Sequence, residues 1–441
     1  MKNFIKISNR IKPFDKAIQI EGDKSLSIRW ALLASQAIGK SKSFNLLKSE
    51  DVENTLRCLK KLGVRVKKYK NSCEITSKGL NSFKNSKSIT LNAGNSGTLG
   101  RLLLGLLVHT RNKITLKGDK SLSKRDFLRV TQPLEKFGAT FITNSDGRLP
   151  LTVMGTSSPK PIRYFENRGS AQCKSSVMLA AINTKGVTKI KAKKSRNHTE
   201  LLFKYLKIPI KIQKKKKYDL INIKGKKSIK SFNYKIPSDI SSSAFFIVLT
   251  ALTEKSKIKI KDVNINSTRF GFIKILKMMG VKINLRNIKN YKGEKLADLH
   301  VESAKKLKPL NCPTNLNSSA IDEFLLIFLV AAKANGISSF KKLSELNQKE
   351  SPRLLWGSKI LNKMGIKNIV ENNNIKIFGN PNLDLKKEIT IRGFLKDHRV
   401  FMTSVVAALT FGGKWKIYDQ ESIKTSFPSF LYKIKELGAK I

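Results

Sequence analysis

Basic and small polar side chains recur in this chain where apolar segments begin. The residues that share this placement are Lys24, Ser25 and Arg29; Asn95, Ser96, Gly97, Thr98 and Arg101; Ser170, Gln172 and Lys174; and Arg125, Arg196 and Arg353 at further segment starts. A helix N-terminus presents free N–H groups and a positive dipole end, so a cation there typically costs about 0.3–1 kcal/mol. Repeated use of cations at such points predicts that phosphate or carboxylate groups are held there.

Carboxylates are fewer at comparable positions. Asp322 and Glu323 begin the fifth apolar segment, and Glu350 follows Lys349 just before another helix-like run. Such groups can move protons to and from a bound substrate. Each residue also has an ordinary alternative, because Asp322 alone could be an acidic N-cap, Lys24 alone one of 87 basic residues, and GNSGT a plain turn. The recurrence of the placement favours a binding and catalytic role.

The sequence contains no recognisable motif for binding a metal or a cofactor. The four histidines, His109, His198, His300 and His398, share no metal-ligand spacing, and neither HExxH nor a paired-cysteine motif occurs. A GxSxG elbow, a Walker loop and a dinucleotide fingerprint are missing as well. We therefore expect no catalytic metal and no cofactor, and acid–base chemistry on an anionic substrate.

An internal repeat sets the elements that must position these residues. A helix-like run, a turn residue and a short β-branched stretch occur six times, with turn residues 69 to 85 residues apart. The turn residues are Gly63, Gly138, Lys207, Gly280, Gly365 and Gly438. Glycine adopts the left-handed conformation without a Cβ clash, and Lys207 is the exception. A serine 12 to 15 residues upstream of each predicts an N-cap and helices of three to four turns: Ser49, Ser123, Ser195, Ser267, Ser351 and Ser426.

Six more apolar segments alternate with these runs. They include GDKSLSIRWALLASQAIG, GNSGTLGRLLLGLLVHT and SAIDEFLLIFLVAAKANG. Near-continuous hydrophobicity is typical of helices buried on most sides. The sequence thus predicts an α/β (α+β) protein of six units, each of roughly 73 residues in the order strand, buried helix, strand, outer helix, strands. Six units suit two lobes of three.

A net charge of +56 is compatible with a polyanionic partner such as nucleic acid or an anionic membrane. Lysines are nevertheless spread over every segment, only KIQKKKKYD at 211–219 forms a dense run, and no aromatic-interleaved basic stripe is visible along the chain. The joint abundance of lysine, asparagine and isoleucine fits a bias toward AT-rich codons. We favour this interpretation over RNA or DNA binding and expect small anionic substrates.

Cellular compartment is indicated by three features of the sequence. No uncharged apolar run approaches the roughly 18 residues of a membrane span, and MKNFIKISNR lacks the apolar core of a secretory signal. Four widely spaced cysteines, Cys58, Cys73, Cys173 and Cys312, give no disulfide framework. We expect a cytoplasmic protein whose fold begins at this start and whose thiols are reduced and mostly buried.

Eight motifs, in order along the chain, resemble those of the EPSP synthase (3-phosphoshikimate 1-carboxyvinyltransferase) family of enolpyruvyl transferases. They are GDKSLSIRWALLA, LNAGNSGTLGRLL, GSAQCKSSVMLA, SRNHTELL, IPSDISSSAFF, IDEFLLI, KESPRL and DHRVFM. The resemblance implies two lobes, each of three βαβαββ units with buried helices, an inside-out α/β barrel. It places 1–20 and 238–441 in lobe one, 21–237 in lobe two, and the active site in the cleft between them.

The resemblance also implies a reaction and its residues. The enolpyruvyl group of phosphoenolpyruvate would pass to the 5-hydroxyl of shikimate 3-phosphate, in the shikimate pathway toward chorismate and the aromatic amino acids. Shikimate 3-phosphate would be bound by Lys24, Ser25, Arg29, Ser170, Gln172, Arg196, Asp322 and Lys349. Phosphoenolpyruvate would be bound by Lys24, Gly97, Arg125, Gln172, Arg353 and Arg399. Asp322 would take the hydroxyl proton, and Glu350 or Lys24 would protonate the enol methylene.

Four departures from the family pattern are visible. KESPR has Pro352 where the family commonly has aspartate, and proline in a first helical turn lacks an N–H. ELNQKE replaces a more basic run, and Asn197 stands where aspartate is usual. Lys424 lies one place from a lysine that some relatives use. None of these departures removes a proposed catalytic residue.

Two other functions stay open on the sequence. The sister enzyme acting on UDP-N-acetylglucosamine is expected to show Lys-Asn at its first motif and a reactive loop cysteine, whereas Ser25 follows Lys24 here. An RNA-binding or RNA-end-processing protein is motivated by the charge and by a related repeat in RNA 3′-phosphate cyclases. We expect a monomer without nucleic-acid or membrane partners, inhibited by glyphosate because Gly97 leaves room beside the donor site.

Overall fold

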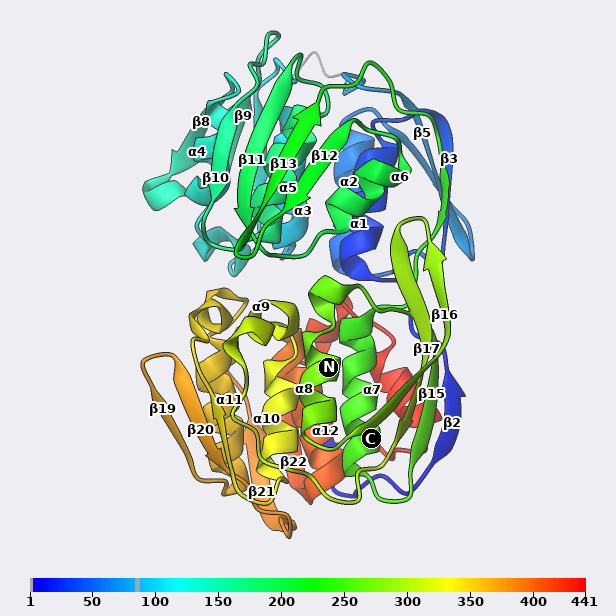
Figure 1. The fold of residues 1–441 in the computed structure, drawn as a ribbon, viewed down its shortest axis with the longest axis vertical. Helices are drawn as coiled ribbons and strands as arrows, with labels where there is room; N and C mark the ends of the chain where they lie inside the picture. Colours follow the sequence, from blue (N-terminus) through cyan, green and yellow to red (C-terminus); the bar gives the residue numbers. More distant parts are fainter. Residues whose placement is uncertain (1–2, 84–87) are drawn as a thin grey trace. The chain divides into compact units, whose positions relative to one another are not determined.

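The chain divides into two units of similar size. A computed structural model describes residues 3–83 and 88–441, so the first two residues of the expected lobe one lie outside the described residues. Unit 1 comprises Met1–Glu21, Pro237–Asn290 and Lys295–Ile441, and unit 2 comprises Gly22–Ile236 and Tyr291–Glu294 (Figure 1). The sequence-based boundaries, 20/21 and 237/238, do not include the short segment 291–294 in the second unit.

Unit 2 holds three buried helices inside three four-stranded sheets. The buried helices are α1 (Lys24–Ala34), α3 (Gly97–Leu107) and α5 (Ala171–Ala181), and the outer helices are α2 (Glu50–Lys61), α4 (Leu128–Glu135) and α6 (His198–Tyr205). The sheets, in strand order, are β14 (Asn233–Lys235), β3 (Ile38–Phe44), β5 (Ser72–Lys78), β4 (Arg65–Lys68); β6 (Ile89–Asn92), β7 (Ile114–Lys117), β9 (Arg148–Met154), β8 (Thr140–Asn144); and β10 (Arg163–Glu166), β11 (Val187–Lys193), β13 (Tyr218–Lys224), β12 (Ile210–Lys214). In each sheet the first pair is parallel and the others are antiparallel.

Unit 1 repeats the same plan. Its buried helices are α7 (Ile240–Leu252), α10 (Phe324–Ala332) and α12 (His398–Phe411), and its outer helices are α8 (Gly271–Met278), α11 (Arg353–Met364) and α13 (Phe430–Glu436). Its sheets, in strand order, are β16 (Lys282–Tyr291), β17 (Glu294–Glu302), β15 (Lys257–Asn264), β2 (Asp15–Ile18); β18 (Ile337–Phe340), β20 (Asn374–Phe378), β19 (Asn368–Glu371); and β1 (Phe4–Ile7), β22 (Gly412–Tyr418), β21 (Leu385–Ile391). The predicted fold class of repeated βαβαββ units around buried helices is confirmed.

Each unit has its own hydrophobic core. The strands alternate buried and exposed residues, as in β5, where Cys73, Ile75 and Ser77 point inward. Period-two alternation is what a sheet with one face in the core requires. The central helices are apolar on nearly all sides because they pack against sheets and against each other, as the residues of α10 show. All four cysteines are buried and free, as expected.

The predicted turn residues all adopt the left-handed conformation. Gly63 has a φ of 84° and Gly438 a φ of 98°, and the exception Lys207 also has a positive φ, 53°. A non-glycine residue in this region is strained by contact between its Cβ and the backbone. The repeat therefore imposes its backbone geometry at the one position where the sequence lacks glycine.

The predicted serine N-caps are mostly wrong. Only Ser49 is the N-cap residue of its helix, and α4, α6, α8 and α13 have seven or eight residues rather than three to four turns. Before α4 and α8 the chain forms short 3-10 turns capped by other side chains: Asp119 Oδ1 accepts from Leu122 N at 2.8 Å, and Asn266 Oδ1 from Thr268 N at 2.9 Å. These side-chain hydrogen bonds to the backbone compete with helix formation, so each outer helix begins only after the short turn.

Within residues 3–83 and 88–441, no single helix has the length and apolar character needed to cross a bilayer, although one sharply bent pair, 314–320 with 324–332, meets the test by length and composition.

Candidate active site

Three buried helices of unit 2 begin in the same way. The N-cap side chains of Asp23, Ser96 and Ser170 accept hydrogen bonds from N–H groups three residues on, at 2.8, 3.2 and 3.3 Å. Each cap accepts a hydrogen bond from one of the free backbone N–H groups of the first turn and so fixes the orientation of that turn. The predicted residues Lys24 and Gly97 are the first residues of α1 and α3, and Gln172 lies in the first turn of α5.

Lys24 is paired with a carboxylate that the sequence motifs did not single out. Its Nζ lies 3.1 Å from Asp51 Oδ2, in the first turn of α2. The Lys24 side chain is 22% exposed and Asp51 only 6%, so the ammonium is the accessible member of the pair. Asp51 lies 27 residues further along the chain, and only the packing of α2 against α1 brings the two together.

Arg29 occupies a buried position one turn into α1. Its guanidinium donates to Thr199 Oγ1 at 2.9 Å, to Ser175 Oγ at 3.2 Å and to the Ser25 carbonyl at 3.1 Å. It therefore joins α1 to α5 and α6, in addition to any contact with a ligand. Arg196, predicted beside it, is half-buried immediately before the N-cap of α6.

Arg125 lies against the first turn of α3. Its Nη2 donates to Asn95 Oδ1 at 3.0 Å, and a Cβ added to Gly97 would lie 2.9 Å from its Nη1. That separation is shorter than real Cβ contacts, so the glycine leaves the guanidinium the space it occupies. The structure thus brings together two of the predicted phosphoenolpyruvate residues, Gly97 and Arg125.

Gln172 is held from both ends of its amide. Its Nε2 donates to Thr98 Oγ1 at 3.0 Å, and Arg101 Nη1 donates to its Oε1 at 2.6 Å. Burial, assisted by the nearby positive charge of Arg125, lowers the pKa of Arg101 to about 10. Arg101 thus orients the Gln172 amide, although the sequence motifs place it at the start of α3 without a role in the site.

The loop before α5 is built on a buried carboxylate. Glu166 accepts from the backbone N–H groups of Arg168, Gly169 and Ser170 at 3.1, 2.7 and 2.9 Å. Burial raises the pKa of Glu166, although these hydrogen bonds oppose the change. Ser170, a predicted substrate ligand, therefore lies in a turn whose backbone is fixed by hydrogen bonds to Glu166.

Lys174, which the sequence also places near this helix start, is a structural residue. Its Nζ lies 2.6 Å from Glu200 Oε1, and their side chains are 1% and 4% exposed. A buried ion pair of this kind must be complete, because removing one partner leaves an uncompensated charge. The pair joins α5, which GSAQCKSS begins, to α6, which SRNHTE begins.

Unit 1 has its own cluster, centred on Arg353. Asp397 accepts from Arg353 Nε at 2.9 Å and from its Nη2 at 3.2 Å, Asp322 Oδ1 lies 3.3 Å from Nη1, and Glu350 also pairs with Nη2. The Arg353 side chain is 2% exposed. Burial opposes its charge, but Asp397, Glu350 and Asp322 outweigh burial and raise the pKa of Arg353 above its ordinary value.

Asp322 lies between cations. Lys349 Nζ is 3.4 Å from Asp322 Oδ1, on the same oxygen that faces Arg353. Arg399 Nη1 donates to the Asp322 carbonyl at 2.9 Å and lies 3.7 Å from Glu323 Oε1. Glu323 also accepts from Ser241 Oγ, so it is a buried link between α7 and α10. All five predicted residues of lobe one, namely Asp322, Lys349, Glu350, Arg353 and Arg399, belong to this cluster.

Two of the departures from the family pattern have a structural account. Pro352 is the N-cap of α11 and has no side chain to cap it, but Asn347 Oδ1 accepts from Leu354 N at 3.2 Å. Lys424 is exposed and pairs with Glu421, which agrees with its omission from the site. Asn197 is the N-cap residue of α6 without a side-chain cap bond.

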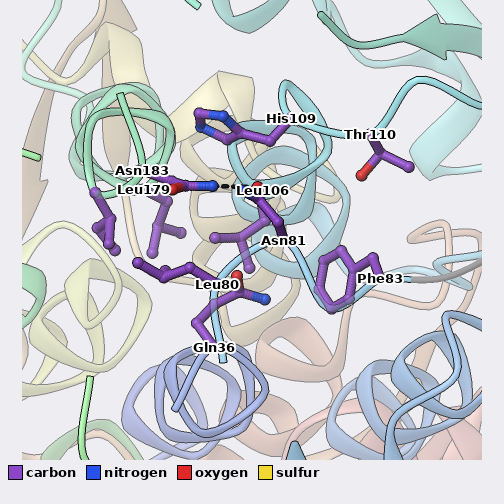
Figure 2. Close-up of a pocket in the computed structure, with 10 residues that line it drawn as sticks. Gln36, Leu80, Asn81, Phe83, Leu106, His109, Thr110, Leu179 and Asn183 are labelled. Carbon is purple, nitrogen blue, oxygen red and sulfur yellow. Dashed lines mark hydrogen bonds between the residues drawn. The ribbon is translucent and has the colours of Figure 1, made fainter. Parts of the chain in front are cut away.

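A small cavity of about 20 Å³ lies at the opposite, C-terminal ends of the buried helices of unit 2 (Figure 2). Its lining includes Gln36, Leu106, His109 and Asn183 and contains none of the predicted site residues. It has room for about one water molecule. The polar helix starts, not this cavity, hold the groups suited to anion binding and proton transfer.

Comparison with known proteins identifies relatives of this arrangement. The family model for EPSP synthase (3-phosphoshikimate 1-carboxyvinyltransferase) matches residues 8–434. A 3-phosphoshikimate 1-carboxyvinyltransferase of Ruthia magnifica subsp. Calyptogena magnifica is 38% identical over 426 residues, covering 96% of this chain and 95% of the relative. The enzyme of that name from Zymomonas mobilis subsp. mobilis is 35% identical over 439 residues, covering 98% and 96%.

Solved structures give the same picture. An EPSP synthase from Acinetobacter baumannii superposes with a TM-score of 0.87 at 32% identity, covering 100% of this chain and 99% of that chain. The enolpyruvyl transferase NikO from Streptomyces tendae gives a TM-score of 0.78 at 14% identity, covering 100% and 98%. At that identity the second likeness concerns the fold alone.

Proposed function

The chain belongs to the EPSP synthase family, and we propose that its two charged clusters, one in each unit, act on the same pair of substrates. It is a transferase of the shikimate pathway, which moves the enolpyruvyl group of phosphoenolpyruvate to the 5-hydroxyl of shikimate 3-phosphate and releases phosphate. The main support is the Asp322 carboxylate, held within 3.5 Å of both Lys349 and Arg353. That cluster supplies a proton acceptor beside cations suited to phosphate and carboxylate.

Shikimate 3-phosphate needs a dianion site and partners for its hydroxyl groups. In our proposal Lys24, Ser25, Arg29, Ser170, Gln172 and Arg196 of unit 2 bind it, together with Asp322 and Lys349 of unit 1. The N-cap bonds of α1 and α5 support the proposal, because they fix the first turns that carry Lys24 and Gln172. Helix starts bind anions through free N–H groups and the helix dipole.

Phosphoenolpyruvate carries a phosphate and a carboxylate, and the proposal gives it four cations. These are Lys24, Arg125, Arg353 and Arg399, with Gly97 and Gln172 completing its site. Guanidinium groups suit such a ligand because two parallel N–H groups match a carboxylate or phosphate edge. Asn95 supports this assignment by holding one end of the Arg125 guanidinium at 3.0 Å.

The chemistry requires two proton transfers in its first stage. We propose that Asp322 accepts the 5-hydroxyl proton while that oxygen attacks C2 of phosphoenolpyruvate, and that Glu350 or Lys24 gives a proton to C3. In the second stage the C2–O bond to phosphate breaks and the new methyl group returns its proton, which restores the double bond. Positioning and electrostatic stabilisation provide the rate enhancement without a covalent enzyme intermediate.

Neither of the two other functions considered from the sequence is favoured as the enzymatic activity of this chain. The curated relatives at 33–38% identity carry the name 3-phosphoshikimate 1-carboxyvinyltransferase, and the sister activity on UDP-N-acetylglucosamine has no support beyond the shared fold. We further propose that the enzyme is a cytoplasmic monomer whose metabolic substrates are small anions and whose reaction uses no metal or cofactor.

A coupled phosphate-release assay tests the proposed function. Phosphate should appear from phosphoenolpyruvate only when shikimate 3-phosphate is present, and UDP-N-acetylglucosamine should not replace it. The Asp322→Asn variant is the matched control, because it preserves side-chain size while removing the proton acceptor. Phosphate release that ignores the second substrate, or that prefers the nucleotide sugar, would overturn the proposal.

A further inference from the structure

The outer face of the sheet β10–β11–β13–β12 carries an ordered set of cations. The strand register places Arg163, Lys189, Asn222 and Lys211 side by side across the four strands. Two residues along, it places Phe165, Lys191, Leu220 and Gln213 in the next row. These side chains line one shallow groove on this sheet. We call these two rows, together with Tyr218, the basic sheet face.

Both acidic residues of these four strands lie on the other face. Glu166 is 1% exposed and bonds to the backbone of the loop that follows it. Asp219 is opposite Ala192 in the register, and Ala192 is buried, so Asp219 is on the core-facing side. Within the described residues of these strands, no carboxylate therefore faces the groove.

A second sheet of unit 2 shows that this is not a general result of abundant lysine. On β3–β5–β4, Lys40 and Lys42 lie 3.8 and 3.6 Å from Glu74, which occupies the central strand. One carboxylate therefore offsets part of the positive charge of that face. On the basic sheet face every charged side chain is positive, and such a surface concentrates polyanions.

Two aromatic rings lie among these cations. Lys191 Nζ is 4.9 Å from the centroid of the Phe165 ring and 4.5 Å from that of Tyr218. Phe165 is 53% exposed although its side chain is large and apolar. Exposed rings on a sheet, with cations between them, are the arrangement by which sheet platforms stack unpaired bases and contact the adjoining phosphates.

The densest basic run of the chain extends this face. Lys214 to Lys217 end β12 and form the turn to β13, and all four are exposed. The run had no role in the proposed reaction. Lys214 is opposite Asp219 in the register and lies on the other face, whereas Lys215 to Lys217 form the turn and add three cations to one end of the basic sheet face.

Against the expectation from the sequence that nucleic acid is no partner, we propose that the basic sheet face binds single-stranded nucleic acid. Unpaired bases stack on Phe165 and Tyr218, and the phosphates contact Lys189, Lys191, Lys211 and the lysines of the turn. A duplex offers no exposed base faces to the rings. An acidic peptide would contact the cations but would have no use for the two aromatic rings. None of the proposed catalytic residues lies on this face, so the inference does not depend on the enzymatic assignment.

Fluorescence anisotropy with a labelled 12-nucleotide oligouridylate, titrated at several salt concentrations, tests the proposal. The logarithm of the binding constant should fall linearly with that of salt, by about 0.7 for each phosphate contact. Phe165→Leu should weaken binding roughly tenfold without changing this slope, because it removes stacking but no charge. The triple variant Lys189→Gln, Lys191→Gln and Lys211→Gln should make the slope shallower by about 2.

A matched control variant distinguishes binding at this face from non-specific attraction to the overall positive charge. Lys257→Gln, Lys259→Gln and Lys261→Gln on β15 of unit 1 remove the same charge and should leave the affinity and the slope nearly unchanged. An equal loss in the two triple variants, or no effect of Phe165→Leu, overturns the proposal. Phosphate release and the melting temperature, measured for every variant, confirm that each is folded.

Competitors identify the ligand. Displacement by oligothymidylate as well as oligouridylate supports a site for single strands of either sugar, and displacement by RNA alone narrows it to RNA. Equal displacement by an RNA duplex, or by polyglutamate of the same charge, contradicts stacking of unpaired bases and overturns the proposal.

Discussion

Arg353 and Asp397 form a two-bond ion pair at the junction of two helices. Asp397 is the N-cap of α12 and is 0% exposed, and its carboxylate accepts from Arg353 at 2.9 and 3.2 Å. The same carboxylate accepts from Ser351 Oγ at 2.8 Å and from the backbone N–H of Arg399 at 2.9 Å. One buried group thus sets the start of both helices that present the proposed phosphoenolpyruvate cations Arg353 and Arg399.

Replacement of Asp397 by asparagine should therefore damage both stability and donor binding. We expect a loss of about 3 kcal/mol in the free energy of unfolding, at the lower end for a broken buried pair, because Arg353 keeps Asp322 and Glu350. The KM for phosphoenolpyruvate should rise. Urea denaturation and steady-state kinetics measure the two effects. Ser351→Ala is the control and should cost only about 1 kcal/mol, and equal effects in both variants would contradict the assigned role of the ion pair.

Asp322→Asn should lower kcat by a factor of roughly 10² to 10⁴ while the protein stays folded. The amide keeps the size of the side chain but cannot accept the hydroxyl proton. Lys349 and Arg353, at 3.4 and 3.3 Å, would still be in place to bind anions, so the KM values should change less than kcat. Steady-state kinetics with circular dichroism measures this, and an unchanged kcat would rule out Asp322 as the base.

The sequence predicted the repeat, the buried helices and the starts of those buried helices because these depend on local periodicity and turn chemistry, whereas it misplaced the starts of most outer helices. The stretch GDKSLS occurs twice, at 22–27 and at 118–123, and illustrates the limits of such prediction. Asp23 caps Leu26 N and Asp119 caps Leu122 N, both at 2.8 Å, yet only the first copy continues into a long helix. The shared letters reflect one capping geometry, and the residues beyond each copy decide whether a long helix forms.

Long-range pairs could not be predicted in this way. Asp51 and Lys24 are 27 residues apart, and Asp397 and Arg353 are 44 apart, so no spacing rule for a single helix or strand relates them. For the same reason the basic sheet face could not be predicted from the sequence. Its cations alternate with buried residues along each strand, and only the register across four strands makes them neighbours.

Gly97→Ala should weaken the binding of phosphoenolpyruvate and of glyphosate, which we expect to compete with it. The added Cβ would lie 2.9 Å from Arg125 Nη1, so the end of that side chain must move. Loss of one charge-assisted hydrogen bond corresponds to roughly a tenfold change or more in KM and in the inhibition constant. Inhibition kinetics measures this effect. Gly100→Ala on the same helix, whose Cβ would face Phe127, is the control and should leave both constants nearly unchanged. Equal inhibition of wild type and Gly97→Ala would contradict the expectation.

Asn347→Ala should destabilise the start of α11. Pro352 provides no cap, and Asn347 Oδ1 accepts the Leu354 N–H in its place at 3.2 Å. Loss of such a cap costs about 0.5–2 kcal/mol, and because Arg353 is the first residue of the helix, the KM for phosphoenolpyruvate should rise as well. Asn347→Asp keeps an acceptor and should restore both values. A variant pair that unfolds at the same urea concentration would show that the contact is not a cap.

His109 should make the protein less stable in mild acid. Its Nε2 lies 2.8 Å from the Ala180 carbonyl beside the small cavity of unit 2 (Figure 2), and burial lowers its pKa below the ordinary value although that hydrogen bond opposes the change. The unfolded chain therefore binds the proton more readily than the folded one. The resulting stability is present above the ordinary pKa of about 6.5 and is lost as the pH falls toward the lower folded-state value.

His109→Gln can still donate to Ala180 but does not titrate, so its melting temperature should fall less than that of the wild type between pH 7.5 and 5.5. Thr110→Ser alters the same cavity without a titratable group and should retain the wild-type pH dependence; identical pH profiles for His109→Gln and the wild type would exclude His109 as the group responsible.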